Sequence, residues 1–306
     1  MKILNIPTTP YQVGIATTKN RRDTNQDAGV VFYFERNRYI IEDTKNNRRS
    51  IPLSKEPSLL AGAIICDGLH NKGDMVSDAL VNLFIELLPY ADIDNPQPID
   101  RFNLRSYSRI KRIEHGASTT LIHTIDRNHN LTQGYIGDSR GYIVKKNTGL
   151  VQLVSRDHNY QRTIVEHELK RDITKPHIID FYDDPKETEY IHAPLQTGLV
   201  PATSRLTKSM SGFQEQTLDR TIYEHSSETT LLLEEEDSSI TLTDGAYEAF
   251  RNNRGLLKKI ITENNPTTAA KKIIQLAERT GDDNATAIVM KRPRTKRSKS
   301  PLPQLL

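Results

Sequence analysis

The stretch "AIICDGLHNKGDMVSDALVNLFIELL", residues 63–88, joins an apolar strand to an amphipathic helix through one acidic residue and one glycine. The apolar run that ends at Cys66 leads directly into Asp67 and Gly68. Apolar residues then recur at helical spacing, which predicts a helix over Asp74–Leu88 with one buried face. The carboxylate at the end of the strand has two explanations: it belongs to a turn, or it faces a positive group.

The composition favours a soluble intracellular protein. A chain of 306 residues can bury a full core, and its longest apolar run, Leu59–Cys66, is far too short to cross a bilayer. The first ten residues lack the apolar segment of a secretory signal. Cys66 is the single cysteine, which excludes an intramolecular disulfide framework and a cysteine-based zinc site. We therefore expect a cytoplasmic protein.

The net charge of +3 hides two different regions. Six of the 42 basic residues lie in the last stretch, residues 291–306, which contains no acidic residue, so the remaining chain carries 36 basic and 39 acidic residues. Charge therefore gives no reason to expect nucleic-acid binding by the body. The tail over 292–306 is either a disordered solubilising end or a segment that contacts a nuclear import receptor or an anionic surface.

Period-two patterns and turn residues predict a chain dominated by strands, with helices over Asp74–Leu88, Gly245–Asn252 and Thr267–Arg279. The predicted strands are Tyr11–Thr17, Ala28–Glu35, Leu59–Cys66, Thr119–Ile125, Leu131–Gly137, Gly141–Lys145, Leu150–Val154, Thr230–Leu233, Ile240–Thr243 and Ala285–Met290. Short polar links predict that the strands starting at Leu131, Gly141 and Leu150 pair as consecutive hairpins. An antiparallel sheet or sandwich covered by helices, an α+β fold, fits this order best. Residues 157–229 are polar and weakly periodic, which predicts an inserted flap.

Carboxylates mark the ends of several predicted strands. Asp67 and Asp244 each follow a strand and precede a glycine, whereas Asp27 and Asp283 each precede a strand. In an antiparallel sheet the end of one strand lies beside the start of its neighbour, so these four side chains can gather along one edge. Asp138 follows another strand and could join them.

Such a cluster would be unstable without cations, because clustered carboxylates repel one another. Hard oxygen ligands without cysteine or paired histidines select Mg²⁺ or Mn²⁺ over zinc. Any single Asp-Gly after a strand, or Asp-Asn before one, is also explained as a turn or a cap. The metal interpretation therefore depends on all of these carboxylates meeting in one place.

Seven segments now resemble a known family. In order along the chain they are "RRDTNQDA", "AIICDGL", "GASTTLI", "YIGDSRGYIV", "VSRDHN", "ITLTDGAYEAF" and "GDDNATAIVM". Together they resemble the motif set of the metal-dependent PPM (PP2C-like) serine/threonine phosphatases, over about residues 10–291. The resemblance implies a β-sandwich of two mostly antiparallel sheets flanked by helices, in a single domain over residues 1–291 with the flap inserted beside the active site.

The resemblance also implies the roles of individual residues. Asp67 would bridge two metal ions, and the carbonyl of Gly68 would bind one of them. Asp244 and Asp283 would complete the other shell, and Asp138 would bind a third, weaker metal. The metal ligands expected here are Asp27, Asp67, Gly68, Asp138, Asp244 and Asp283. Arg22 resembles the arginine that holds the substrate phosphate, a role that suits a bidentate guanidinium.

Two positions depart from the family pattern. Gln26 stands where many members have a glutamate, and a neutral amide binds a metal more weakly. The loop after Gly68 is shorter than in bacterial-type members. His70 in this loop is either the acid that protonates the leaving alkoxide, as in some relatives, or a surface histidine.

The expected activity is hydrolysis of phosphoserine and phosphothreonine in proteins by a metal-activated water at a binuclear Mg²⁺ or Mn²⁺ centre. The alternative is a catalytically weak or inactive PPM-like binding module. The expected partners are phosphorylated proteins, with the chain acting as a monomer. The sequence leaves the substrate open, as well as whether the enzyme works in the cytoplasm, in the nucleus or in another cell.

Overall fold

The computed structural model describes residues 10–90, 98–155, 179–180, 210–211, 219–221, 231–250 and 254–294. Nearly all of the predicted flap over 157–229 and of the predicted tail over 292–306 lies outside these ranges, so both remain predictions. Within the described residues, none of the helices has the length and apolar character needed to span a membrane.

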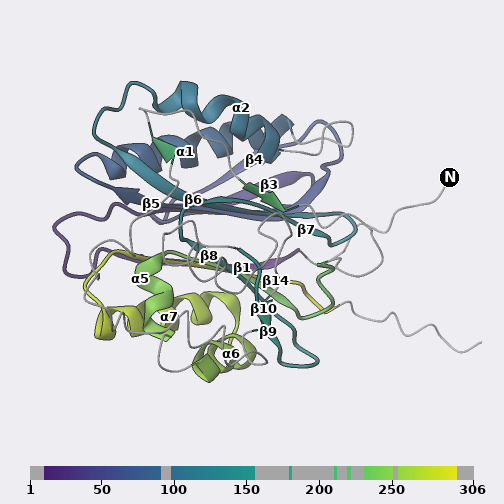
Figure 1. Ribbon diagram of the computed structural model, residues 1–306. Helices are drawn as coiled ribbons and strands as arrows, with labels where there is room; N and C mark the ends of the chain where they lie inside the picture. Colours follow the sequence, from purple (N-terminus) through teal and green to yellow (C-terminus); the bar gives the residue numbers. More distant parts are fainter. Residues whose placement is uncertain are drawn as a thin grey trace, which may run out of the picture.

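The described strands form two antiparallel sheets that lie face to face (Figure 1). The larger sheet contains, in spatial order, β12 (Asp219–Thr221), β7 (Leu131–Ile136), β6 (Ala117–Asp126), β5 (Leu59–Leu69), β2 (Ala28–Glu35), β3 (Arg38–Asp43) and β4 (Arg48–Pro52), with β11 (Met210–Ser211) paired to β6. The smaller sheet contains β1 (Gln12–Thr18), β14 (Ala285–Lys291), β13 (Ser238–Leu242), β8 (Arg140–Val144), β9 (Val151–Leu153) and β10 (Ile179–Asp180).

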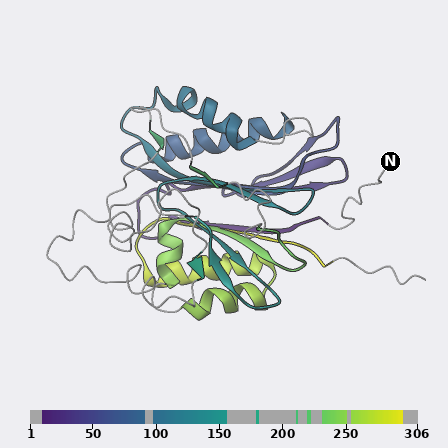
Figure 2. The same cartoon turned by 45° about the vertical axis from the view of Figure 1, so that its right-hand side comes forward.

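Helices cover the outer face of each sheet, which gives four layers (Figures 1 and 2). The larger sheet is covered by α1 (Gly73–Leu87), which continues as a short 3-10 helix over Leu88–Tyr90, and by α2 (Pro98–Ile110). The smaller sheet is covered by α5 (Asp244–Tyr247) with the 3-10 helix Glu248–Phe250, by α6 (Arg254–Glu263) and by α7 (Pro266–Thr280). Asn265 caps α7 by accepting a hydrogen bond from the N–H of Thr268, and Pro266 fills the first helical position, where no N–H is needed.

Each interface between layers has its own apolar core. Phe32, Phe84 and Phe102 belong to the core between the larger sheet and its helices. A second core joins the smaller sheet to α5, α6 and α7. The third core lies between the sheets, where Ile65 and Leu121 of the larger sheet join Ile288 of the smaller one. Because the sheets are covered on both faces, their central strands β5, β6 and β13 are buried almost throughout.

The predicted α+β class and the sandwich of two antiparallel sheets flanked by helices are confirmed. The three predicted helices exist, but the second ends its α-helical part at Tyr247 and continues as a 3-10 helix to Phe250. Seven of the described helices and strands were not predicted: β3, β4, α2, α6 and the short strands β10, β11 and β12 within the predicted flap. The predicted strand Thr230–Leu233 was wrong in its described part, where Leu232 makes only an isolated bridge to Asn130.

The predicted hairpin between Leu131–Gly137 and Gly141–Lys145 was also wrong. β7 pairs with β6 in the larger sheet, whereas β8 pairs with β13 and β9 in the smaller one. The link from Gly137 to Ser139 therefore carries the chain from one sheet to the other, with Gly137 at a φ of +101° that a side chain would strain. The next predicted hairpin, β8 with β9, is confirmed.

His123 connects the two sheets through a buried polar network. Its Nδ1 lies 2.7 Å from the Oγ of Ser239 in β13, across the sandwich. Its Nε2 lies 3.2 Å from the Oε1 of Gln133 in β7. The side-chain amide of Gln133 donates to the carbonyl of Val154, so its Oε1 is free to accept from the imidazole Nε2–H. Burial lowers the pKa of His123 to about 4, because the interior disfavours the charged ring.

We expect this histidine to make stability depend on pH. The unfolded chain takes up a proton below about pH 6.5, whereas folded His123 stays neutral until about pH 4. The contribution of His123 to the free energy of unfolding should therefore be complete above pH 6.5. It should fall by up to roughly 3 kcal/mol as the pH drops to 4. Urea unfolding of wild type and His123→Gln between pH 7.5 and 4 measures this, since all other titrating groups are shared. Parallel stability curves for the two proteins would contradict the expectation.

Candidate active site

Asp67 and Gly68 lie within β5 and not in a turn. The strand runs to Leu69, and Asp67 pairs with Thr119 while Gly68 pairs with Ser118 of β6. Turn chemistry therefore does not explain these residues. A Cβ on residue 68 would lie 2.5 Å from the carbonyl oxygen of Gln26 and 2.6 Å from the carbonyl carbon of Gly73. The first turn of α1 thus packs backbone to backbone against the end of β5, and only glycine allows this approach.

Asp244 and Asp283 are brought together by two neighbouring strands of the smaller sheet. Asp244 is the first residue of α5, directly after β13 ends, and Asp283 lies just before β14 begins. β13 and β14 pair antiparallel, so the end of one lies beside the start of the other. Gly245 brings the two segments into direct contact, because a Cβ there would lie 2.1 Å from the carbonyl oxygen of Asn284.

Asp27 is buried where the two sheets meet. It precedes β2 of the larger sheet, yet its Oδ2 accepts a hydrogen bond of 2.9 Å from the hydroxyl of Thr243 in the smaller one. That hydroxyl also accepts from the N–H of Thr286, at 2.9 Å. The other oxygen of Asp27, Oδ1, is buried and has no hydrogen-bond partner among the residues that the structure describes. A buried carboxylate oxygen without a partner is costly, so this atom is a candidate for binding a cation.

The carboxylates of this edge raise one another's pKa. Burial raises the pKa of Asp67 well above its usual range, with further contributions from the charges of Asp244, Asp27 and Asp138. Burial likewise raises the pKa of Asp27 to about 7 and that of Asp244 to about 6, the latter also through the charge of Asp283. A direct interaction between the Asp67 and Asp244 side chains further raises the pKa of Asp67 and lowers that of Asp244. Without cations, these carboxyl groups therefore keep their protons to a higher pH than ordinary aspartates do.

Arg22 reaches this cluster from the loop between β1 and β2. Its guanidinium forms an ion pair of 2.8 Å with Asp283, in which both side chains remain substantially exposed. This hydrogen bond raises the pKa of Arg22, and the charges of Asp244 and Asp67 contribute in the same direction. Arg22 is therefore placed where it can meet an anion in front of the carboxylates.

Asn284 is a residue of this site to which the sequence analysis gave no role. Its buried side chain accepts from the N–H of Gln26 at 2.9 Å and donates to the carbonyls of Lys19 and Thr24, each at 3.0 Å. It thereby fixes the loop that carries Arg22 to the backbone next to Asp283. The motif "GDDNATAIVM" contains Asn284, but these contacts span more than 250 residues of sequence and leave no local signal.

The remaining candidates lie around this edge. Asp138 is partly exposed in the link after β7, and its charge acts on Asp67. His70 is exposed, with a φ of +65°, and the structure uses its carbonyl, which accepts a hydrogen bond of 2.7 Å from the side-chain amide of Gln26. The residues of "VSRDHN" from Arg156 onward lie outside the described residues.

The structure brings the expected ligands together without arranging them as a finished metal cage. In the part of the chain that the structure describes, no three histidine, cysteine, aspartate or glutamate side chains are grouped as a ready metal site. Asp67 and Asp244 act on each other's pKa, and Asp283 forms an ion pair with Arg22. The donor set nevertheless fits Mg²⁺ or Mn²⁺, since it consists of carboxylates and the unpartnered Oδ1 of Asp27.

This four-layer arrangement is the fold of the PP2C-type (PPM) serine/threonine phosphatases. The serine/threonine phosphatase PstP/Ppp of Mycobacterium tuberculosis is similar to the chain with a TM-score of 0.62 and 17% identity, over 94% of this chain and 100% of that one. The S. agalactiae serine/threonine phosphatase gives 0.62 and 16%, over 93% and 100%. The PstP catalytic domain in complex with two manganese ions gives 0.57 and 16%, over 93% and 100%. No protein-family model and no curated protein sequence matches the chain.

We expect the contact of Gly245 with Asn284 to be essential for this geometry. Gly245→Ala places a methyl group against a backbone oxygen, so we expect a loss of about 1–3 kcal/mol in the free energy of unfolding. Gly255→Ala in α6 is the matched control, because a Cβ there meets nothing within 4 Å, and alanine should stabilise that helix by up to about 1 kcal/mol. Urea unfolding of both variants tests this, and equal effects of the two substitutions would refute it.

Proposed function

We propose that this protein is a metal-dependent protein phosphatase that hydrolyses phosphoserine and phosphothreonine. The observation that carries the proposal is the convergence of Asp27, Asp67, Asp244 and Asp283 from two sheets, with Arg22 bonded to the outermost of them. Repelling carboxylates buried together indicate a site built for cations, and an arginine beside them suits a phosphate dianion. Similarity in fold to serine/threonine phosphatases supports the same conclusion.

In this proposal the carboxylates and the carbonyl of Gly68 would hold two divalent cations, and Asp138 would contribute to a weaker third site. The cations, when bound, offset the charge of the carboxylates and supply the Lewis acidity that activates water for attack on a phosphate ester. Arg22 exchanges its bond to Asp283 for the phosphate oxygens of the substrate and orients the phosphorus. His70, exposed two residues beyond Gly68, is our candidate for protonating the leaving alkoxide.

The donor set decides which cations the site takes. Mg²⁺ and Mn²⁺ prefer carboxylate and carbonyl oxygens, which are the atoms available at this edge. The side-chain amide of Gln26 is already engaged, because it donates a hydrogen bond to the carbonyl of His70 in the loop after Gly68.

We further propose that the protein acts as a monomer on phosphorylated proteins in the cytoplasm.

The test is hydrolysis of a phosphothreonine peptide by the full chain with and without Mn²⁺. We expect activity that depends on Mn²⁺ and that falls by at least about a hundredfold in the double variant Asp67→Asn, Asp244→Asn, because the ligands lose their charge. Arg22→Lys should instead raise KM more than it lowers kcat, since it weakens a bidentate contact to phosphate. Calorimetry with Mn²⁺ should show binding by wild type and not by the double variant.

Folding of the double variant is its own control. Removing two buried, mutually repelling carboxylates should leave the metal-free protein at pH 7.5 at least as stable as wild type in urea. A stable double variant that keeps the activity of wild type would refute the mechanism. If wild type binds no Mn²⁺ at all, the chain is a PPM-like binding module and not an enzyme.

A further inference from the structure

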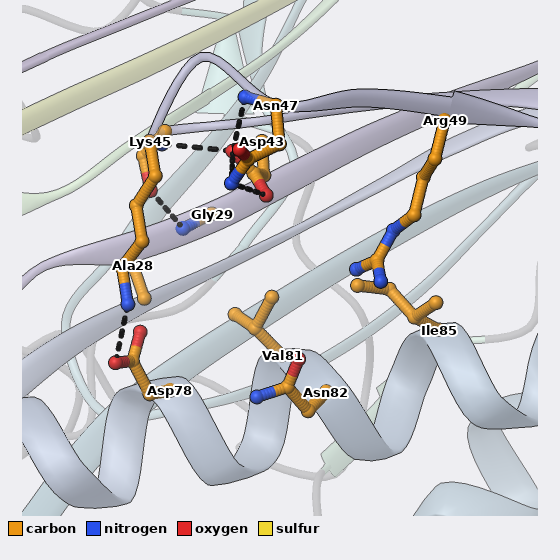
Figure 3. A pocket seen from close by; sticks show the side chains of 11 residues that line it. Ala28, Gly29, Asp43, Lys45, Asn47, Arg49, Asp78, Val81, Asn82 and Ile85 are labelled. Atoms are coloured by element: carbon orange, nitrogen blue, oxygen red, sulfur yellow. Dashed lines mark hydrogen bonds and ion pairs between the residues drawn. The ribbon is translucent and has the colours of Figure 1, made fainter.

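A pocket of about 220 Å³ lies between the β3–β4 hairpin and helix α1, on the outside of the larger sheet (Figure 3). The hairpin forms one wall and α1 forms the other. The floor consists of Ala28, at the start of β2, and of Val81 and Ile85, which are buried side chains on the inner side of α1. The pocket therefore has polar walls and an apolar floor, which suits a small amphipathic molecule.

Two cationic side chains reach from the hairpin toward α1, one at each end of the pocket (Figure 3). Lys45 forms an ion pair with Asp78 at 2.6 Å. Arg49 points toward the helix beside Ile85, which carries no charge. Within the described ranges, the exposed side chain of Arg49 makes no ion pair or hydrogen bond. One cation is thus neutralised by the helix and the other is not.

The other carboxylate of the pocket, Asp43, is held within the hairpin turn and not by Arg49. Both oxygens of Asp43 are occupied within the hairpin turn, where they accept from the N–H groups of Lys45 and Asn47, each at 2.9 Å, and from the side-chain amide of Asn47. Asp43 therefore stabilises the turn itself. The pocket presents an unpaired guanidinium and the Asn82 amide above an apolar floor.

Both walls of the pocket connect directly to the carboxylate edge. Thr44 of the turn donates from its N–H to the carbonyl of Gly29 at 3.0 Å and accepts from the N–H of Gly29 at 3.2 Å. Gly29 lies two residues from Asp27. The opposite wall, α1, begins at Gly73, which packs against Gly68 next to Asp67. A molecule inserted between the walls would therefore press on segments that hold two of the carboxylates.

We propose that this pocket binds a small organic anion, whose negative group pairs with Arg49 and whose apolar part lies on Val81 and Ile85. The chemistry of the pocket calls for a carboxylate-sized anion, because a guanidinium binds a planar carboxylate through two parallel hydrogen bonds. Occupancy changes the spacing of the two walls and thereby the affinity of the carboxylate edge for cations. Only this second part depends on the proposed metal centre.

The first experiment measures binding in the metal-free full chain, with benzoate as the probe and benzamide as its uncharged match. We expect benzoate to shift the backbone amide NMR signals of Lys45, Val81 and Ile85 in a saturable way, and benzamide to bind at least about tenfold more weakly, since it lacks the charge. Arg49→Gln should weaken benzoate to the level of benzamide. Arg38→Gln, an exposed arginine of β3 that does not line the pocket, is the matched control and should leave benzoate binding unchanged.

The second experiment measures coupling by calorimetry with Mn²⁺, with and without saturating benzoate. We expect benzoate to change the Mn²⁺ affinity of wild type by about fivefold or more, and to have no such effect on Arg49→Gln, which also accounts for any binding of benzoate to free Mn²⁺. Benzoate binding that is absent, or that survives Arg49→Gln, would overturn the site. Site-specific binding without any effect on Mn²⁺ would overturn the coupling. Absence of Mn²⁺ binding would refute the proposed phosphatase. The first experiment alone would then decide whether the anion site exists.

Discussion

Mutual repulsion among buried carboxylates is the constraint on which the rest of this structure depends. Asp27 and Asp67 are attached to the larger sheet, whereas Asp244 and Asp283 are attached to the smaller one. Charges so placed would drive the two sheets apart, so the sandwich must hold them by other means. It does so with the apolar core between the sheets and with short polar links, notably Thr243 to Asp27 and His123 to Ser239. The site is thus an edge of mutually repelling charges on a well-packed scaffold.

The strands next to the motifs could be predicted from the sequence because their signals are local. Ala28–Glu35 was predicted with its observed bounds, and Asn265-Pro266 marked the start of α7 correctly. Two of the missed elements had weak signals: β4 is largely exposed and polar, and α2 carries so many polar residues that its buried side, which includes Phe102 and Ile110, did not stand out. The choice of sheet for β8 could not be predicted, because a three-residue link fits a hairpin and a crossover equally well.

The candidate site could be predicted as a set of carboxylates, since strand ends and strand starts of antiparallel neighbours must meet. Its finer organisation could not, because it depends on contacts between distant segments. Examples are the three hydrogen bonds from Asn284 to the loop of Arg22, and the pairing of Arg22 with Asp283. The glycines were informative for a related reason: Gly68 and Gly245 each sit where another backbone leaves no room for a side chain.

The pairing of β1 with β14 has a consequence for how the protein is made. β1 is an edge strand whose partner in the sheet lies at residues 285–291, almost the whole chain away. A chain that emerges from the ribosome from its N-terminus cannot complete the smaller sheet until that last strand has appeared. Asp283 is also synthesised long after Arg22, so the ion pair between Arg22 and Asp283 cannot form until then. The proposed catalytic edge can therefore form only after residues 283–291 have been synthesised.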